Sequence, residues 1–66
     1  MSVAKVIEIT SSSPTSFAEA ARVGIAKAAE TVHGIKGAWI SEERVVVEND
    51  EIVEFRVTMR VSFVLD

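Results

Sequence analysis

The side chains best suited to binding chemistry are the single tryptophan of the chain and two arginines near its C-terminal end. Trp39 offers a flat aromatic surface on which a planar ligand can stack. Arg56 and Arg60 offer guanidinium groups, which bind phosphate or carbonyl oxygens. These three side chains can act together only if the secondary structure brings them to one surface.

Residues typical of catalysis are nearly absent. The chain has no Cys and one His, and it contains no glycine-rich phosphate loop. His33 is expected near the end of a helix, where a cationic imidazole complements the helix dipole. The serines at positions 11–13 are explained by helix capping. The sequence therefore predicts a protein that is not an enzyme.

Three acidic residues, Glu48, Asp50 and Glu51, are the weak candidates for a metal site. Carboxylate oxygens are the ligands that Ca²⁺ and Mg²⁺ prefer in proteins. Their spacing does not match an EF-hand loop, however, so a solvated turn is the favoured explanation.

The C-terminal run from Val53 to Leu65 alternates between apolar and polar side chains. Every odd position is apolar: Val53, Phe55, Val57, Met59, Val61, Phe63 and Leu65. A period of two predicts one long strand with one buried face. Such a strand is about 40 Å long at ~3.3 Å per residue. One short helix cannot cover that much sheet, so the pattern indicates a subunit that is completed by copies of itself.

Two further strands and a helix precede this run. Val3–Thr10 is rich in β-branched residues and predicts the first strand, and Gly37–Val47 predicts the second. A hairpin turn at 48–51 joins the second strand to the third. The order predicts an α+β fold of βαββ type. Its three-stranded antiparallel-type sheet, in the order 1-3-2, packs on one helix within a single domain of residues 1–66.

The helix is expected to end near Val32, with Gly34 as its C-cap. Its start has two candidates: Ser13 followed by a proline, or Ser16 in a capping box with Glu19. One apolar stripe faces the sheet: Phe17, Ala21, Gly24, Ile25, Ala28 and Val32.

A turn centred on Asn49 and Asp50 sets the expected pairing of the hairpin. It places Trp39 opposite Arg60, as a cation–π pair, and Glu43 opposite Arg56, as an ion pair. The helix-side face then carries Ala38, Ile40, Val46, Phe55, Val57, Met59 and Val61. The other face carries Gly37, Trp39, Ser41, Glu43, Val45, Arg56, Thr58 and Arg60. No element of the chain remains to cover this second face, so a neighbouring subunit or a planar ligand is expected there.

The composition agrees with self-association. The chain has 66 residues, of which 48% are hydrophobic, and its mean hydropathy is +0.30. A small chain this apolar usually hides the surplus in an oligomer interface. A net charge of −3 without a basic stripe gives no support for nucleic-acid binding. No apolar run is long enough to span a bilayer, and no signal peptide is seen, so the expected location is cytoplasmic.

Two segments of the chain resemble the dodecin family, namely VAKVIEITSSSPTSFAEAA and IVEFRVTMRVSFVL. The resemblance covers essentially the whole chain. It implies small βαββ subunits that assemble into hollow dodecamers. Many dodecins bind flavin (riboflavin, FMN or FAD) between tryptophans and store it without catalysis. Some bind coenzyme A, and others are calcium-binding forms.

Along this resemblance, the family's flavin-stacking tryptophan position falls on Gly37, and its glutamine position falls on Arg56. Trp39 lies two residues further along the same strand and on the same face. In a flavin-binding cage, Trp39 would stack on the ring, Arg56 and Arg60 would contact its polar or phosphate groups, and Gly37 would leave room. The alternative is a structural or calcium-type cage, in which Trp39 and the arginines make subunit contacts.

Overall fold

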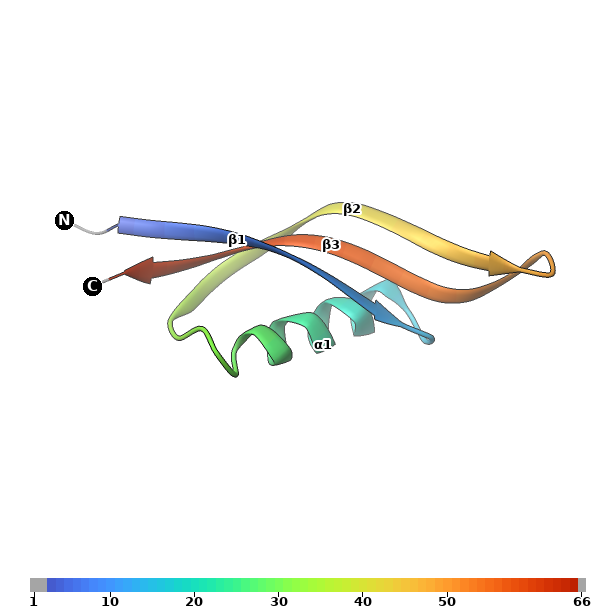
Figure 1. Ribbon diagram of the computed structural model, residues 1–66, viewed down its shortest axis with the longest axis horizontal. Helices are drawn as coiled ribbons and strands as arrows, with labels where there is room; N and C mark the ends of the chain where they lie inside the picture. Colours follow the sequence, from blue (N-terminus) through green and yellow to red (C-terminus); the bar gives the residue numbers. More distant parts are fainter. Residues whose placement is uncertain (1–2, 66) are drawn as a thin grey trace.

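The computed structural model of the protein describes residues 3–65, which form four elements. These are β1 (Val3–Ser13), α1 (Phe17–Ala28), β2 (Ile35–Glu48) and β3 (Glu51–Leu65). The strands form one antiparallel sheet in the order β1-β3-β2, and α1 lies on one side of it (Figure 1). This arrangement confirms the α+β, βαββ fold and the sheet order 1-3-2. β1 and β2 are both longer than expected, because β1 continues to Ser13 and β2 begins at Ile35.

The central strand β3 supplies most of the core. Its alternating pattern turns Val57, Met59 and Val61 towards α1, where they are buried. β1 pairs with β3 from Val3 to Ser13 without a bulge. The third core element is the helix, which adds the buried Ala20. Six partly buried residues surround this core: Ile7, Ile9, Phe17, Ala21, Ile25 and Ile35.

The helix begins at the second of its two candidate caps. The Ser16 hydroxyl accepts a hydrogen bond of 3.0 Å from the Glu19 amide, which satisfies one of the amides left free at a helix start. Ser13 belongs to β1 instead, where its buried hydroxyl accepts a 3.0 Å bond from the Thr15 amide.

The expected helix end near Val32 is wrong, because α1 stops at Ala28. Ala29 is the C-cap, and its amide donates to the Ile25 carbonyl at 2.9 Å. The chain then turns, and the Val32 amide donates to the Ala28 carbonyl at 2.9 Å. Gly34 has a positive φ of 77°, but it serves the loop that enters β2 and not the helix end. The 12-residue α1 is short, and no helix in the described part of the chain is long and apolar enough to cross a membrane.

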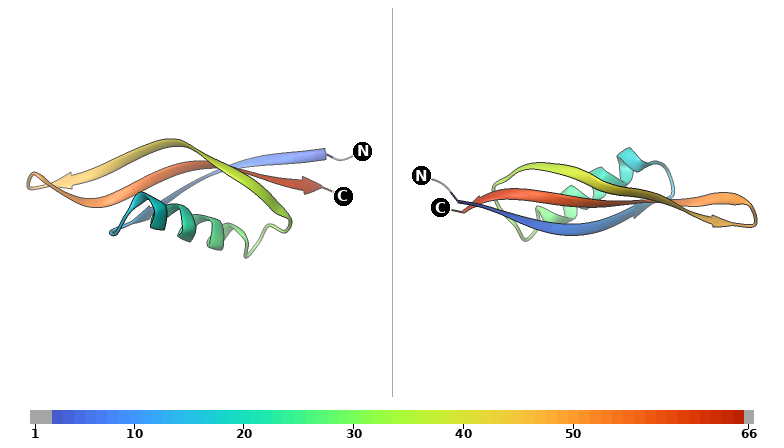
Figure 2. Two further views of the ribbon diagram at one scale, coloured as in Figure 1. Left: turned by 180° about the vertical axis from the view of Figure 1, so that it is seen from behind. Right: turned by 90° about the horizontal axis from the view of Figure 1, so that it is seen from above.

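Small residues let α1 approach the sheet closely. Gly24 is buried, and a Cβ placed on it would lie 2.7 Å from the Met59 methyl carbon and 2.9 Å from Ser11 Cβ. At the start of the helix, the Phe17 ring meets the Phe55 ring edge-on, with centroids 5.2 Å apart. The helix therefore covers the sheet from Phe55 towards the chain termini and leaves the far end of the hairpin uncovered (Figure 2).

The hairpin turn forms as expected, but the register behind it differs. Asn49 and Asp50 have positive φ values of 53° and 64°, as a tight two-residue hairpin turn requires. A first register shift leaves Val53 of β3 without a partner on β2, and a second leaves Ser41 of β2 without a partner on β3. Between these two shifts the pairing moves by one residue, and from residue 40 to residue 37 it returns to the expected register. A third shift, at Lys36, lies at the start of β2.

This shift corrects the expected faces for the middle of β2. Glu43 lies opposite Val57, and Val45 lies opposite Phe55, so both belong to the helix side of the sheet. Val46 lies opposite Glu54 and belongs to the other side. The proposed Glu43–Arg56 ion pair is therefore wrong. Trp39 does lie opposite Arg60, as expected.

Candidate ligand-binding face

The sheet face opposite α1 is made of four cross-strand rows, each with one residue from β1, β3 and β2. We call it the Trp39 face, and its rows are Val6–Ser62–Gly37, Glu8–Arg60–Trp39, Thr10–Thr58–Glu42 and Ser12–Arg56–Arg44. No element of residues 3–65 covers it (Figure 2). The four residues predicted as a ligand site, Gly37, Trp39, Arg56 and Arg60, all lie on this face.

Trp39 is the large aromatic group of this face, and its side chain is open to solvent. It is 52% exposed, although an indole of this size gains substantially from burial. The one aromatic contact within residues 3–65 is the Phe17–Phe55 pair on the helix side, so the expected Trp39–Arg60 cation–π contact is not formed. The indole face is therefore free to stack on another ring.

Arg60 turns away from the indole and towards β1. Its Nε lies 3.6 Å from Glu8 Oε2, and both side chains are more than half exposed. An ion pair this exposed is weak, so a ligand can compete for either partner. Beside Trp39, the Arg60–Glu8 pair presents a hydrogen-bond donor and an acceptor close together.

Arg56 is more firmly held than Arg60. Its Nε donates a 2.8 Å hydrogen bond to Glu54 Oε1, and both side chains are half-buried. This bond, together with a hydrogen bond from Ser12, holds the pKa of Glu54 below the usual range of a glutamate. Arg44 lies directly across from Arg56 on β2. Two cations side by side repel each other, so this end of the face favours an anionic group.

Gly37 leaves space in the row next to Trp39. The Ser62 hydroxyl donates to the Gly37 carbonyl at 3.2 Å, and a Cβ on Gly37 would meet the same hydroxyl oxygen at 3.4 Å. This is the nearest heavy atom to that position. A ring stacked on Trp39 can therefore extend over Gly37 without meeting a side chain from β2.

The distance along β3 limits which ligand can use the whole face. Arg56 and Arg60 are four residues apart, which is about 13 Å in a strand. A ligand that stacks on Trp39 and also contacts Arg56 must therefore be elongated, with a flat ring at one end and polar or anionic groups at the other.

The acidic hairpin turn does not form a cation site within one chain. Glu48 and Glu51 lie opposite each other at the turn, and Asp50 lies within it. All three are exposed. Within residues 3–65, no group of three or more Asp, Glu, His or Cys side chains is arranged to hold a metal ion. A cation bound here would need ligands from outside the chain.

His33 lies in the loop between α1 and β2, five residues beyond the last helical residue, and it is exposed. The expected role of His33 at the helix end is wrong, because the helix stops earlier than the sequence suggested.

Three neighbours of Arg56 were not predicted from the sequence: Ser12, Arg44 and Glu54. Ser12 was assigned to a loop, but β1 extends far enough to place it beside Arg56. Arg44 was not considered, because the expected register put Glu43 across from Arg56. A run of alternating residues gives no sign of where an extra residue will form a β-bulge, so these neighbours become apparent only in the folded structure.

A search of protein families matches residues 3–66 to the dodecin model. The chain belongs to the dodecin family. It is 36% identical to the calcium dodecin of Mycobacterium tuberculosis over 63 residues, which cover 96% of this chain and 89% of that protein. Proteins of this family bind or store ligands and are not enzymes, which confirms the expectation that this chain is not catalytic.

Solved dodecin structures have the same fold. A dodecin from Streptomyces davaonensis superposes with a TM-score of 0.94 at 32% identity, covering 98% of this chain and 96% of that one. The calcium dodecin from M. tuberculosis, described as a calcium-chelating antigen with a novel calcium-binding site, superposes with a TM-score of 0.85 at 33% identity. That match covers 97% of this dodecin and 91% of the other chain.

Proposed function

We propose that this dodecin forms a homo-oligomeric cage of twelve subunits, which binds and stores a flavin (riboflavin, FMN or FAD) without catalysis. The observation that carries the proposal is the half-exposed Trp39 on a sheet face that no element of residues 3–65 covers. Assembly would shelter this face, and a flat ligand between two such faces would stack on the indole of each.

The neighbours of Trp39 suit the edge of a flavin ring. That edge carries carbonyl oxygens, which accept hydrogen bonds, and an N–H group, which donates one. Arg60 supplies a donor and Glu8 supplies an acceptor, so together they replace what a single amide side chain would provide. Arg56 lies opposite Arg44, at the end of the face away from Trp39. A phosphate on the flavin's side chain would reach this end when the ring stacks on Trp39.

Titration with riboflavin and FMN tests this function. We expect flavin fluorescence and Trp39 fluorescence to be quenched together, with micromolar affinity. Trp39→Ala should weaken binding by roughly 5- to 160-fold, since stacking on an aromatic side chain is worth roughly 1–3 kcal/mol per ring. Trp39→Phe should retain part of the affinity.

Arg22→Ala is the control for these variants. Arg22 is an exposed residue of α1, on the opposite side of the sheet from Trp39, so its truncation should leave the affinity unchanged. A wild-type protein that leaves flavin fluorescence and Trp39 emission unaltered would reject flavin as the ligand.

A calcium-type cage is the second candidate, and the similarity to calcium dodecin favours it. In that case Trp39 and the arginines would make subunit contacts, and Glu48, Asp50 and Glu51 would supply carboxylates to a Ca²⁺ or Mg²⁺ ion shared between subunits. Calorimetry should then show heat on addition of Ca²⁺, and Asp50→Asn should reduce it. The absence of any heat with the assembled protein would reject this role.

A further inference from the structure

The outer end of the β2–β3 hairpin is an arm that projects beyond the helix (Figures 1 and 2). We define this hairpin arm as residues 45–54. It carries four exposed aliphatic side chains, namely Val45, Val47, Ile52 and Val53, and two of them, Val47 and Ile52, are more than half exposed. A two-stranded hairpin is at best marginally stable in water when nothing packs on it. The arm therefore needs a covering surface.

The apolar side of the arm continues the layer that α1 covers elsewhere. Val45 pairs with Phe55, whose ring contacts Phe17 at the first residue of the helix. Val47 and Ile52 pair with each other on this same side, one step further out. Because the helix begins at Phe17, no helix or strand among the described residues 3–65 packs on them.

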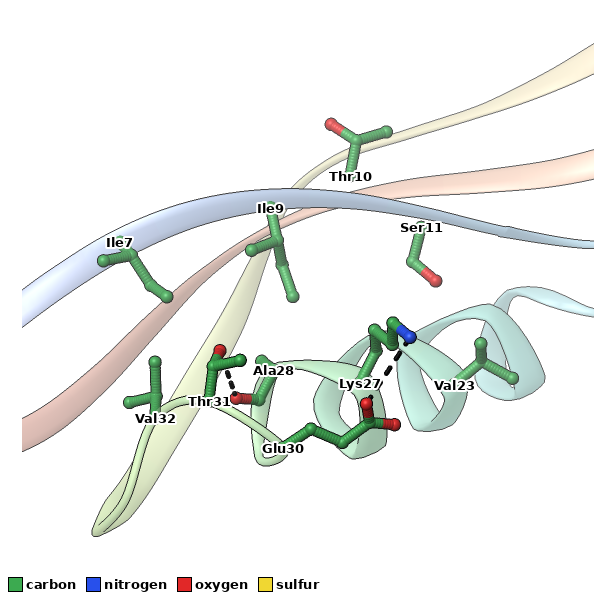
Figure 3. Close-up of a pocket in the computed structure, with 11 residues that line it drawn as sticks. Ile7, Ile9, Thr10, Ser11, Val23, Lys27, Ala28, Glu30, Thr31 and Val32 are labelled. Carbon is green, nitrogen blue, oxygen red and sulfur yellow. Dashed lines mark hydrogen bonds and ion pairs between the residues drawn. The ribbon is translucent and has the colours of Figure 1, made fainter.

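The same subunit also has an apolar groove, which lies beside α1. An open groove of about 510 Å³ runs between α1 and the free edge of β1 (Figure 3). Its apolar lining consists of Ile7, Ile9, Val23, Gly24, Ala28 and Val32. Val23 is 46% exposed in the isolated subunit, so this surface also gains from a cover. The groove lies on the helix side of the sheet and takes no part in the Trp39 site.

The arm is short enough for the groove, and the groove offers its acidic tip a cation. The β1 wall of the groove spans residues 7–11, about 13 Å, and the β3 side of the arm spans residues 51–54, about 10 Å. The arm ends in the carboxylates of Glu48, Asp50 and Glu51, and the groove is bordered by Lys27 together with Glu30. Lys27 lies 3.4 Å from Glu30, but both side chains are largely exposed, so this ion pair is weak and can be exchanged.

We propose that the hairpin arm of one subunit lies in the α1–β1 groove of the next subunit. The inference rests on the proposed self-assembly and names the surfaces that achieve it. Because the arm and the groove are different surfaces, the contact is head-to-tail. Contacts of this kind generate closed rings when the rotation between subunits closes. The acidic turn of each subunit would then lie beside Lys27 of its neighbour.

Cysteine cross-linking tests this contact, because the natural chain contains no Cys and only introduced thiols can react. Val23→Cys marks the groove and Val47→Cys marks the arm. The two variants, carrying different mass tags, are refolded together and treated with a short, flexible bismaleimide. We expect covalent pairs that join position 23 of one chain to position 47 of another, several-fold more abundant than pairs between identical variants.

Val3→Cys is the matched control for the groove variant. Val3 is an exposed aliphatic residue on β1, but it lies outside the groove. Replacing the Val23→Cys partner with Val3→Cys should abolish most of the cross-linking to Val47→Cys. Equal yields from the two partners, or a predominance of pairs joining position 47 to position 47, would overturn the proposed contact.

Light scattering on the same samples distinguishes a failure of the arm-in-groove contact from a failure of the proposed cage. Large particles that lack the 23–47 cross-link would overturn the arm-in-groove contact and leave the proposed cage intact. Monomers alone would overturn the cage and the contact together. Cross-linked particles that do not bind riboflavin would support the contact and reject only the flavin ligand.

Discussion

The two arginines of the Trp39 face find their partners along β3 and on β1, and not across the hairpin. Arg56 bonds Glu54 on its own strand, and Arg60 reaches Glu8 on β1. Within residues 3–65, neither arginine forms a cation–π contact with Trp39. The indole is therefore held by its position in β2 and not by a charged partner, which leaves both its surface and the Arg60–Glu8 pair available to a ligand.

The Glu54 carboxylate gives the first prediction, which concerns pH. Its pKa is lowered by the hydrogen bond from Arg56 and, secondarily, by that from Ser12, so the folded state binds a proton less readily than the unfolded chain. Its stabilising contribution is complete above the ordinary pKa of a glutamate and is lost as the pH falls through the lowered value. Glu54→Gln should therefore reduce the urea midpoint at neutral pH and make little difference in strong acid. Glu30→Gln, at an exposed position in the turn after α1, is the control, and an equal loss at both pH values would contradict the assignment.

Gly24 gives the second prediction, because it sets the distance between α1 and the sheet. In Gly24→Ala the new Cβ would meet the Met59 methyl carbon at 2.7 Å and Ser11 Cβ at 2.9 Å. Met59 can bend away, but Ser11 Cβ moves only with β1. We expect a loss of roughly 1–3 kcal/mol in the free energy of unfolding, reduced by the better helix propensity of alanine. Gly37→Ala, with a nearest contact of 3.4 Å, should change stability little. Equal effects in urea unfolding would contradict close helix–sheet packing at Gly24.

Among the elements, the strands were predicted well from the sequence, because a strict alternation of apolar and polar residues is a strong signal of a strand. The alternation from Val53 to Leu65 predicted the central strand, and the Asn49–Asp50 pair predicted the turn, whose positive φ values those residues tolerate. The pairing of Trp39 with Arg60 was also correct. The reason is that the extra residue Val53 on β3 is cancelled by the extra residue Ser41 on β2.

What the sequence could not predict depends on tertiary geometry. Nothing in the alternation from 42 to 46 distinguishes the observed register from one shifted by a residue, so Glu43 and Val45 were placed on the wrong face. The helix end was also missed, since the apolar stripe continues to Val32 although the chain must already turn after Ala28 to reach β2. Neither error moved Gly37, Trp39, Arg56 or Arg60 from the expected face.

The start of α1 gives a prediction at this scale. Ser16→Ala removes the side chain that accepts the Glu19 amide, and it should lower the free energy of unfolding by roughly 0.5–2 kcal/mol. Ser16→Asp should keep most of the stability, since an aspartate accepts the same bond and its charge is favourable at a helix N-terminus. Urea unfolding followed by circular dichroism measures both. A Ser16→Ala variant as stable as the wild type would show that packing of Phe17 on Phe55 alone sets the helix start.

The whole molecule is more extended and more exposed than a compact monomer of its size. Its radius of gyration is 13.6 Å, whereas a compact chain of 66 residues would have about 11 Å. Its accessible surface is 4761 Å², against about 4100 Å² for a compact monomer of 7.2 kDa. The hairpin arm and the Trp39 face both contribute exposed large apolar side chains to this surface. These are the surfaces for which we propose a neighbouring subunit and a ligand.

This shape leads to a prediction about the dependence of unfolding on protein concentration. If burial between subunits completes the fold, dilution must favour the unfolded chain by mass action. The unfolding enthalpy of one subunit is only about 46 kcal/mol at ~0.7 kcal/mol per residue. A hundredfold dilution should therefore lower the melting temperature by on the order of 10 °C, provided unfolding and dissociation are coupled and reversible.

Substitutions on the hairpin arm should reveal whether this surface causes the dependence of the melting temperature on protein concentration. Ile52→Lys places a charge on the side that we expect to be covered by the next subunit, so it should lower the melting temperature and reduce particle size in light scattering. Lys5→Ile is the contrasting control, since Lys5 is exposed on β1 outside the groove. A melting temperature that is independent of concentration in the wild type, with monomers at every dilution, would mean that one subunit tolerates its bare arm and needs no neighbour.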